Sequence, residues 1–331
     1  MPAHPSSHRL TDRLTDRAQD AIQPAFRGPA VRVSVVVPHL NQPAMLARCL
    51  ASLAAGTRLP DEVIVVDNGS AVLPDAICAS HPAVQLLQEV TPGPGPARNR
   101  GVAQSTGNIL AFIDADCIAD PGWLAAAEAA LRNPQAQILG GDVRIALTDP
   151  GRLTQLEAYE SIYAYRMDRY IAREGFTGTG NLVVRRAVLE AVGPFAGIGV
   201  AEDRDWGQRA TRAGHAIRYV AEMKVYHPAR LQMSDLRQKW DRHMAHDFTA
   251  SRNGRGMRLK WVLKTLAMAL SPVAEIPRIL TSDRVTGIRN RSLAFVGLIR
   301  IRLYRARRMT QLLLGADPEH LSGRWNRPGA S

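Results

Sequence analysis

The chain has 331 residues, of which 46% are apolar and 22% are charged, so it can bury a sizeable core and has the composition of a globular protein. Its three cysteines, Cys49, Cys78 and Cys117, follow neither disulfide nor metal-site spacing, which favours a reducing cytosol. The chain shows no charged-then-apolar leader, and no apolar run reaches the ~18 residues that span a bilayer. We therefore expect a cytoplasmic protein rather than a secreted or membrane-spanning one.

The positive charge of the chain is concentrated in its last third. The net charge is +12. Residues 1–227 carry 22 Lys and Arg against 23 Asp and Glu, whereas residues 228–331 carry 20 against 7. Such a basic block indicates an anionic partner, which would be a membrane surface, a nucleic acid or an anionic substrate.

Apolar runs alternate with helical patterns from Val31 onward. Residues 1–30 are polar and contain a tandem Arg-Leu-Thr-Asp repeat, and we expect a disordered leader there. The pattern then predicts strands at 31–37, 62–66, 84–87 and 109–113, with helices at 44–55 and from Ala97. Continuous apolar strands between helices are typical of a parallel sheet that is covered on both faces.

Polar residues stand at the carboxyl ends of three of these strands: Asn41, Asp67, and the pair Asp114 and Asp116. Ligands bind at this edge of open parallel sheets. Two carboxylates one residue apart offer the oxygen ligands that a hard divalent cation prefers. A solvated turn is the alternative for the acidic pair, but three polar strand ends at one edge favour a ligand site.

The loop Gly93-Pro94-Gly95-Pro96-Ala97-Arg98 only partly matches a dinucleotide-binding fingerprint. Arg98 replaces the third glycine of that fingerprint, and the prolines remove backbone donors that a pyrophosphate would use. A hydride-transfer site is therefore disfavoured. Arg98 at the start of a helix either contacts phosphate or is an ordinary exposed arginine.

A second group of elements follows residue 150. The pattern predicts one long helix over 153–173, whose tyrosines Tyr159, Tyr163 and Tyr170 either pack in a core, which is favoured, or line an acceptor site. The elements predicted next are a strand at 182–184, a helix at 186–192 and a helix from Glu202 to Gly214.

The acidic residues Glu202 and Asp203 open the last of these helices. Acidic residues in a first helical turn are favoured by the helix macrodipole, so both residues have a purely structural explanation. The alternative is functional, because an ionised carboxylate at this position can take a proton from an attacking hydroxyl.

Several short motifs of the chain occur in the order found in family 2 glycosyltransferases. They are Ser34-Val35-Val36-Val37-Pro38-His39-Leu40-Asn41, Val65-Val66-Asp67-Asn68-Gly69-Ser70, Ala97-Arg98-Asn99-Arg100-Gly101, Asp114-Ala115-Asp116, Thr179-Gly180-Asn181 and Glu202-Asp203-Arg204-Asp205. Residues 31–227 thus resemble these inverting, metal-dependent enzymes. The resemblance implies an α/β GT-A (Rossmann-like) domain with a mixed, mostly parallel sheet flanked by helices, and residues 228–331 would form a basic helical C-terminal region.

The resemblance also implies which residues bind the nucleotide sugar. Pro38, Asn41 and Asp67 would line the nucleotide base and ribose. Arg98 would lie beside the nucleotide, and Asp114 would face the ribose or the sugar.

The metal and the proton acceptor are implied in the same way. Asp116 would bind Mg²⁺ or Mn²⁺ that bridges the diphosphate. His227 would supply another metal or diphosphate contact, with a structural role as its alternative. Asp203 would be the general base that deprotonates the acceptor hydroxyl, with Glu202 supporting it.

The implied reaction moves a single sugar from a nucleotide-diphosphate sugar, with UDP favoured, to a hydroxyl of a glycan or lipid-linked acceptor in cell-envelope glycan biosynthesis. The Gln-x-x-Arg-Trp pattern of processive synthases is not met, because Leu236 and Lys239 replace its Gln and Arg before Trp240. A non-catalytic nucleotide-sugar-binding scaffold subunit is the alternative, and the presence of Asp116 and Asp203 disfavours it.

Apolar islands among the lysines and arginines of residues 228–331 favour helices that lie on an anionic membrane surface. The protein would then be peripheral on the inner face of the plasma membrane. The arginines of 300–308 spread around a helical wheel, so a helical subdomain packed on the catalytic core is the alternative. No recognition module accompanies the cations, and we expect no nucleic-acid partner.

Overall fold

The computed structural model of the chain describes residues 31–251 and 256–318. The helices and strands described below belong to one unit of the chain, which begins at Arg32. The leader predicted over residues 1–30 lies outside the described residues. Among the helices of the described residues, none combines the length and hydropathy needed to cross a bilayer.

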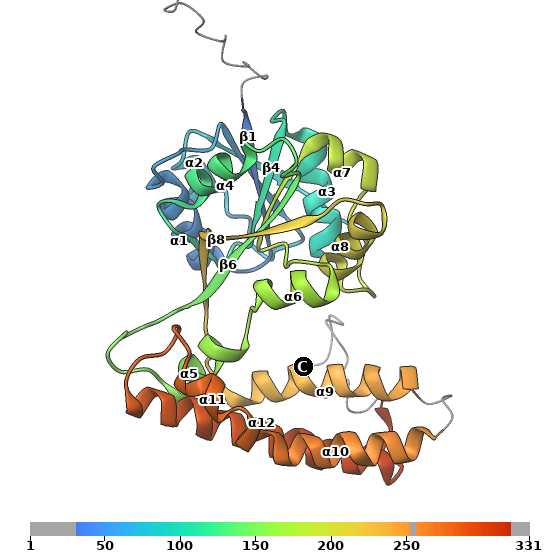
Figure 1. The fold of residues 1–331 in the computed structure, drawn as a ribbon. Helices are drawn as coiled ribbons and strands as arrows, with labels where there is room; N and C mark the ends of the chain where they lie inside the picture. The colour runs from blue at the N-terminus through green and yellow to red at the C-terminus, as the bar shows by residue number, and fades with distance from the viewer. Residues whose placement is uncertain (1–30, 252–255, 319–331) are drawn as a thin grey trace, which may run out of the picture. The chain divides into compact units, whose positions relative to one another are not determined.

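One sheet of eight strands organises the first part of the described chain (Figure 1). Its strands are β1 (Val33–His39), β2 (Glu62–Asp67), β3 (Val84–Gln88), β4 (Ile109–Ile113), β5 (Ile118–Ala119), β6 (Ile138–Ala146), β7 (Asn181–Arg185) and β8 (Ile217–Pro228). Their order in the sheet is β3-β2-β1-β4-β7-β6-β8-β5. β1 to β4 run parallel, as do β6 and β8, whereas β7 and β5 pair antiparallel with their neighbours. The predicted mixed, mostly parallel α/β sheet is confirmed.

Helices cover both faces of this sheet, as the continuous apolar strands predicted. They are α1 (Pro43–Ala54), α2 (Asp75–Ala79), α3 (Pro94–Gln104), α4 (Trp123–Leu131), α7 (Arg186–Val192) and α8 (Glu202–Arg212). Val35 and Val37 of β1 pack in one buried cluster with α1 and α4. Val36 packs in a second cluster with α3, α7 and α8. This alternation follows from the two-residue period of a strand. The parallel direction of β1, β2 and β4 brings their polar carboxyl ends to one edge of the sheet.

The single helix predicted over 153–173 is wrong. The structure has two helices there, α5 (Gln155–Tyr163) and α6 (Met167–Glu174). Tyr165 between them has φ +49°, a left-handed conformation that ends a helix. Thr154 and Glu157 form a capping box that fixes the start of α5. The break directs Tyr165 toward His227, near the end of β8.

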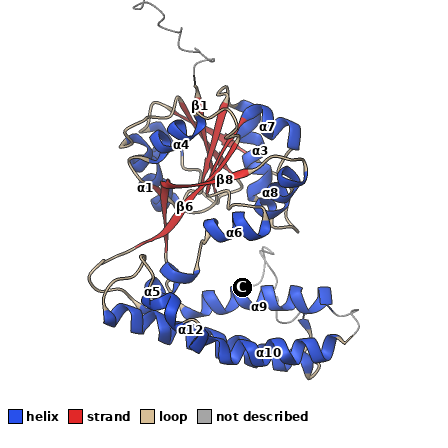
Figure 2. Ribbon diagram, in the orientation of Figure 1, coloured by secondary structure: helices blue, strands red, loops and turns tan. Residues whose placement is uncertain are grey.

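The last part of the described chain is helical, as predicted (Figure 2). Its helices are α9 (Met233–Ser251), α10 (Met257–Ala274), α11 (Ile276–Leu280) and α12 (Ile288–Leu313). Tyr159 and Ile162 of α5 are buried in the same cluster as Leu298 and Ile301 of α12. Helix α5 therefore packs with the C-terminal helices, although it precedes the boundary predicted at residue 227.

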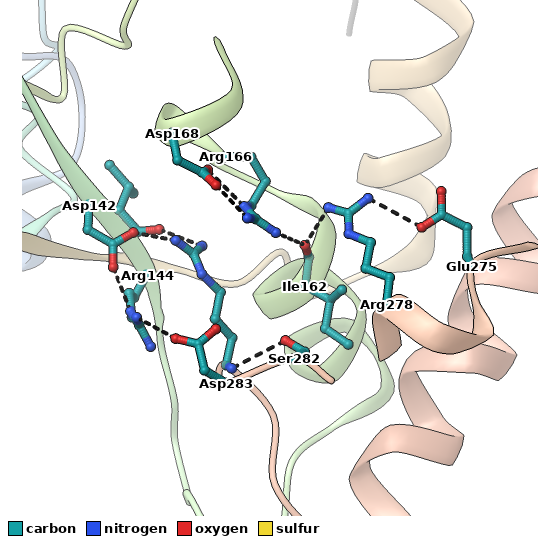
Figure 3. A network of polar contacts seen from close by, with 11 residues as sticks. Asp142, Arg144, Ile162, Arg166, Asp168, Glu275, Arg278, Ser282 and Asp283 are labelled. Atoms are coloured by element: carbon teal, nitrogen blue, oxygen red, sulfur yellow. Dashed lines mark hydrogen bonds and ion pairs between the residues drawn. The ribbon is translucent and has the colours of Figure 1, made fainter. Parts of the chain in front are cut away.

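Ion pairs and a hydrogen bond connect β6 and α5 with α11 and with the loop between α11 and α12 (Figure 3). Asp142 of β6 is buried and forms ion pairs with Arg284 and, at 2.7 Å, with Arg144. Arg144 also pairs with the exposed Asp283 at 3.0 Å. Arg278 donates to the carbonyl oxygen of Ile162 at 3.0 Å. Part of the basic excess of residues 228–331 is therefore used inside the fold, where arginine forks match buried carboxylates.

Candidate active site

The acidic pair Asp114 and Asp116 follows β4 directly. A carboxylate oxygen of each residue and the sulfur of Cys117 lie within 4.8 Å of one another. Burial raises the pKa of Asp116; His227 lowers it and Asp114 raises it, and the net pKa lies above the usual value. Two carboxylates held this close repel each other when both are ionised, so the site favours a positively charged ligand between them.

His227 lies beside Asp116 near the end of β8. Its Nε2 is 3.3 Å from the Asp116 Oδ2. The hydroxyl of Tyr165 lies 3.1 Å from the same nitrogen, and the two rings are 4.5 Å apart. The break between α5 and α6 places Tyr165 here, so Tyr165 positions an imidazole that the sequence alone associated with the metal.

The donor atoms of this group fit a hard divalent cation. Asp114 and Asp116 supply carboxylate oxygens and His227 supplies an imidazole, a set that suits Mg²⁺ or Mn²⁺. Burial raises the pKa of the Cys117 thiol well above its usual value. A protonated thiol is a poor metal ligand, so Cys117 serves as a small buried side chain at this edge.

Arg98 of α3 connects the acidic pair to α8. It is 2% exposed, and its guanidinium donates to Asp114 at 2.6 Å and to Glu202 at 2.9 Å. Its Nε has no partner among the described residues. Both terminal nitrogens are thus occupied by protein carboxylates, which makes Arg98 a positioning residue in this structure. Its predicted place beside the nucleotide stays a prediction.

The ends of β1 and β2 form a second polar group. His39 and Asp67 are paired across the two strands, and both are buried. The backbone N–H of Gln42 donates to His39 Nε2, so the ring proton is assigned to Nδ1, which donates to Asp67 at 2.9 Å. Burial raises the pKa of Asp67, but hydrogen bonds from Ser70 and then His39 lower it below its usual value.

These contacts show what Asp67 does in the structure. Its Oδ2 accepts from the backbone N–H groups of Gly69 and Ser70 at 3.2 and 2.9 Å. The Ser70 hydroxyl accepts from the N–H of Asn41, whose φ is +53°. Asp67 therefore holds the two loops in place, and Asn41 is exposed beside them, as is part of Pro38. The predicted nucleotide contacts of all three residues remain predictions.

Asp203 stands in the first turn of α8, next to Glu202. Burial raises the pKa of Asp203, and the Glu202 carboxylate raises it further, while the N–H of Arg204 and the Arg98 charge lower it. A carboxylate with a raised pKa is a better proton acceptor. The loop 178–180 passes close by, and a Cβ at Gly180 would lie 2.6 Å from Asp114 Oδ2. A side chain at position 180 would therefore displace the acidic pair.

A cavity of about 570 Å³ brings several predicted site residues together. Arg98, Asp114, Glu202, Asp203 and His227 line it. Asp116 does not line it, but it lies between the lining residues Asp114 and Cys117 in the sequence and pairs with the lining residue His227. Among the described residues, the lining does not include the β1 and β2 ends, so Pro38, Asn41 and Asp67 lie outside it.

Sequence reasoning missed the contribution of α9 to this cavity. Lys239, Trp240 and His243 of this helix are part of the lining. Tyr170 and Phe176 also line it, with their rings stacked 5.2 Å apart. The one signal in the sequence is the incomplete Gln-x-x-Arg-Trp pattern around Lys239 and Trp240, which disfavours processive synthesis but does not predict that these residues line a cavity.

Comparison with known protein families and sequences gives consistent matches. The family model described as Glycosyl transferase family 2 matches residues 34–193. Glycosyltransferase AglE from Haloferax volcanii is 32% identical over 206 residues, which are 60% of this chain and 67% of that protein. A pre-mycofactocin glycosyltransferase from Mycobacterium tuberculosis is 29% identical over 217 residues, 63% of this chain and 45% of that protein. The chain thus spans two thirds of the first relative and less than half of the second.

A solved structure resembles the fold over most of the chain. It is the mannosyltransferase PcManGT from Pyrobaculum calidifontis in complex with GDP-Man and Mn²⁺, with a TM-score of 0.53 and 17% sequence identity. The match covers 86% of this chain and 87% of that one. At this identity, the likeness concerns the fold alone.

Proposed function

Because the chain belongs to glycosyltransferase family 2 and has the GT-A fold, we propose that it transfers a single sugar from a nucleotide-diphosphate sugar to an acceptor hydroxyl, with inversion at the anomeric carbon. The observation that carries this proposal is that Asp114, His227 and Asp203 line one cavity, with Asp116 paired to His227 at 3.3 Å. A cation site and a proton acceptor are the two groups that such a transfer needs.

The acidic pair supports departure of the diphosphate. Asp116 and His227 would hold Mg²⁺ or Mn²⁺, with Asp114 next to them and facing the ribose or the sugar, and this ion would offset the negative charge that develops on the leaving group. Arg98 keeps Asp114 in place through its 2.6 Å hydrogen bond. Pro38, Asn41 and Asp67 at the neighbouring strand ends would bind the nucleotide, for which UDP is favoured.

Asp203 is the proposed general base. It takes the proton of the acceptor hydroxyl as the hydroxyl oxygen attacks the anomeric carbon from the face opposite the leaving diphosphate. The Glu202 carboxylate next to it raises the pKa of Asp203, which supports proton transfer. One displacement with no covalent enzyme intermediate then inverts the anomeric carbon.

A panel of nucleotide sugars tests this function. We expect one UDP-sugar to raise the melting temperature in the presence of Mn²⁺ or Mg²⁺, and to be hydrolysed slowly in the absence of an acceptor. Donor binding without any turnover, with or without acceptor extracts, would favour the non-catalytic scaffold subunit. Absence of binding to every nucleotide sugar would contradict both functions.

We also propose that the protein works on an anionic membrane surface, as a peripheral protein of the inner face of the plasma membrane, with a glycan or lipid-linked acceptor. An exposed apolar face of α10 supports this. Its side chains are between 40% and 73% exposed: Leu259, Val262, Leu263, Leu266, Leu270 and Val273. At about 100° per residue, they fall on one side of the helix. Trp261, Met268 and Pro272, on the other side, are buried.

The charges beside this face favour a bilayer over a second copy of the chain. Arg258 and Lys260 are exposed and flank the apolar side chains, and Lys264, also exposed, pairs with Asp247 at 3.0 Å. Such a combination suits a helix that lies among anionic head groups. A second copy of the chain would bring its own basic helical region to the same surface, and the two positively charged regions would repel each other.

Vesicle flotation tests the membrane proposal. Full-length protein should float with phosphatidylglycerol-containing vesicles at low salt and less at high salt. Leu266→Ser with Leu270→Ser should weaken binding about tenfold or more, because each buried Leu contributes about 1.5–3 kcal/mol. The matched control is Leu59→Ser with Val72→Ser, two exposed apolar residues outside the helical region. Equal binding by both double variants, or no binding by the wild type, would contradict the proposal.

A further inference from the structure

The cavity has lining residues of opposite charge. The sheet edge and α8 contribute the carboxylates of Asp114, Glu202 and Asp203. Helix α9 contributes Lys239 and His243, which stand four residues apart and therefore on the same side of the helix. The carboxylates have assigned tasks in the proposed reaction, whereas the Lys239 cation has none. Burial and then the Lys239 charge lower the pKa of His243, so at neutral pH its imidazole acts as an uncharged hydrogen-bond donor beside Lys239.

Lys239 has no carboxylate partner among the residues that the structure describes. In the described part of the chain, neither Lys239 nor His243 belongs to an ion pair, and the nearby Glu160 is already bonded to Arg230. Burial lowers the pKa of Lys239 to about 8, with Arg230 and Arg242 adding repulsion and Glu160 opposing it. A partly buried cation among other cations is unfavourable unless an anion joins it.

We propose that Lys239 and His243 bind an anionic group of the acceptor, a phosphate or a carboxylate. This inference rests on the proposed function. Lys239 and Asp203 line the same cavity, and Asp203 must face the acceptor hydroxyl. The strand ends proposed to bind the nucleotide are outside that lining, and a cation held by Asp116 and His227 would offset the charge of the donor diphosphate. The anion that remains to be bound is therefore on the acceptor.

The test uses full-length protein with inorganic phosphate as the probe. Phosphate is titrated while UDP and Mn²⁺ are saturating, so that the donor site is filled, and binding is followed by calorimetry. Lys239→Gln should weaken phosphate binding about tenfold or more, as expected for a lost charge-assisted hydrogen bond, and leave UDP binding within about twofold. Arg237→Gln is the matched control, since Arg237 is an exposed cation of the same helix outside the lining.

Each other outcome has a definite meaning. Equal phosphate binding by wild type, Lys239→Gln and Arg237→Gln would overturn the anion site. Weakened UDP binding in Lys239→Gln would overturn the proposal that Lys239 binds the acceptor, and would indicate that it binds the diphosphate of the donor. If the wild type failed to bind UDP with Mn²⁺ while phosphate binding still depended on Lys239, the proposed function would fail and the anion site would stand.

Discussion

Carboxylates that are buried or half-buried occur in two regions of the molecule, and their charged neighbours differ. At the junction between the sheet and the C-terminal helices, Asp142 and Glu160 are almost fully buried and each is matched by arginines. At the sheet edge, Asp116 and Asp203 have no arginine partner among the described residues, and both have raised pKa values. Removing a carboxylate from a buried pair leaves an arginine without its counter-charge, whereas a carboxylate without an arginine partner is available for a ligand or a proton.

The largest effect is expected at the paired region. Asp142→Asn should lower the free energy of unfolding by about 3–5 kcal/mol, because it leaves Arg284 buried without its counter-charge. Denaturant titration measures this value. Asp283→Asn is the control: its carboxylate pairs with Arg144 but is largely exposed, so it should cost at most about 1 kcal/mol. Equal losses of unfolding free energy in the two variants would mean that burial of the carboxylate does not determine its contribution to stability.

The next effect concerns catalysis at the acidic pair. Asp116→Asn should lower kcat/KM about 10³-fold, because a bound cation contributes several kcal/mol to transition-state stabilisation. The melting temperature should hold or rise, since the lost carboxylate has no arginine partner. Steady-state kinetics over a range of Mn²⁺ concentrations measures the first value. Asp75→Asn, an exposed carboxylate of α2, should leave both values unchanged.

The sequence predicted the sheet edge well, because that edge depends on local patterns. An apolar run followed by a polar residue locates a strand end, and this pattern found Asp67, Asp114 and Asp116 in their observed places. The start of α8 at Glu202 followed from its acidic first turn. Each of these features is determined by a few residues that are neighbours in the sequence, so the sequence alone predicts it.

The features that the sequence did not reveal depend on distant packing. Strand β6 contains Gly140 and Gly141, which weaken a strand pattern, yet a side chain at either position would collide with Thr177 or Asn181. The break at Tyr165 carries no glycine or proline signal. The packing of α9 with α5 and α12 determines which side of α9 faces the cavity. The local sequence pattern therefore could not place Lys239 in the cavity lining.

A smaller effect on turnover is expected at Asp203. Asp203→Asn should lower kcat at least about 10²-fold, because it removes general base assistance. Affinity for UDP with Mn²⁺ should change little, since the acidic pair is intact. Single-turnover kinetics and calorimetry on the same preparation measure the two quantities. Near-normal transfer would show that another group accepts the proton.

The smallest effect is on stability and has the opposite sign to that of Asp142→Asn. The pKa of Asp203 is raised in the folded state, so the folded protein holds this proton more tightly than the unfolded chain. Stability is therefore lost as pH rises from the ordinary Asp value of about 3.8 through the raised pKa, and the ionised side chain destabilises the fold at neutral pH. Asp203→Asn should raise the melting temperature by about 1–3 °C at pH 7, and the gain should shrink as the pH falls through this window. Thermal melts at several pH values measure it. A variant that melts lower at pH 7 would show that Asp203 belongs with the structural carboxylates, and the contrast between the two regions would not hold there.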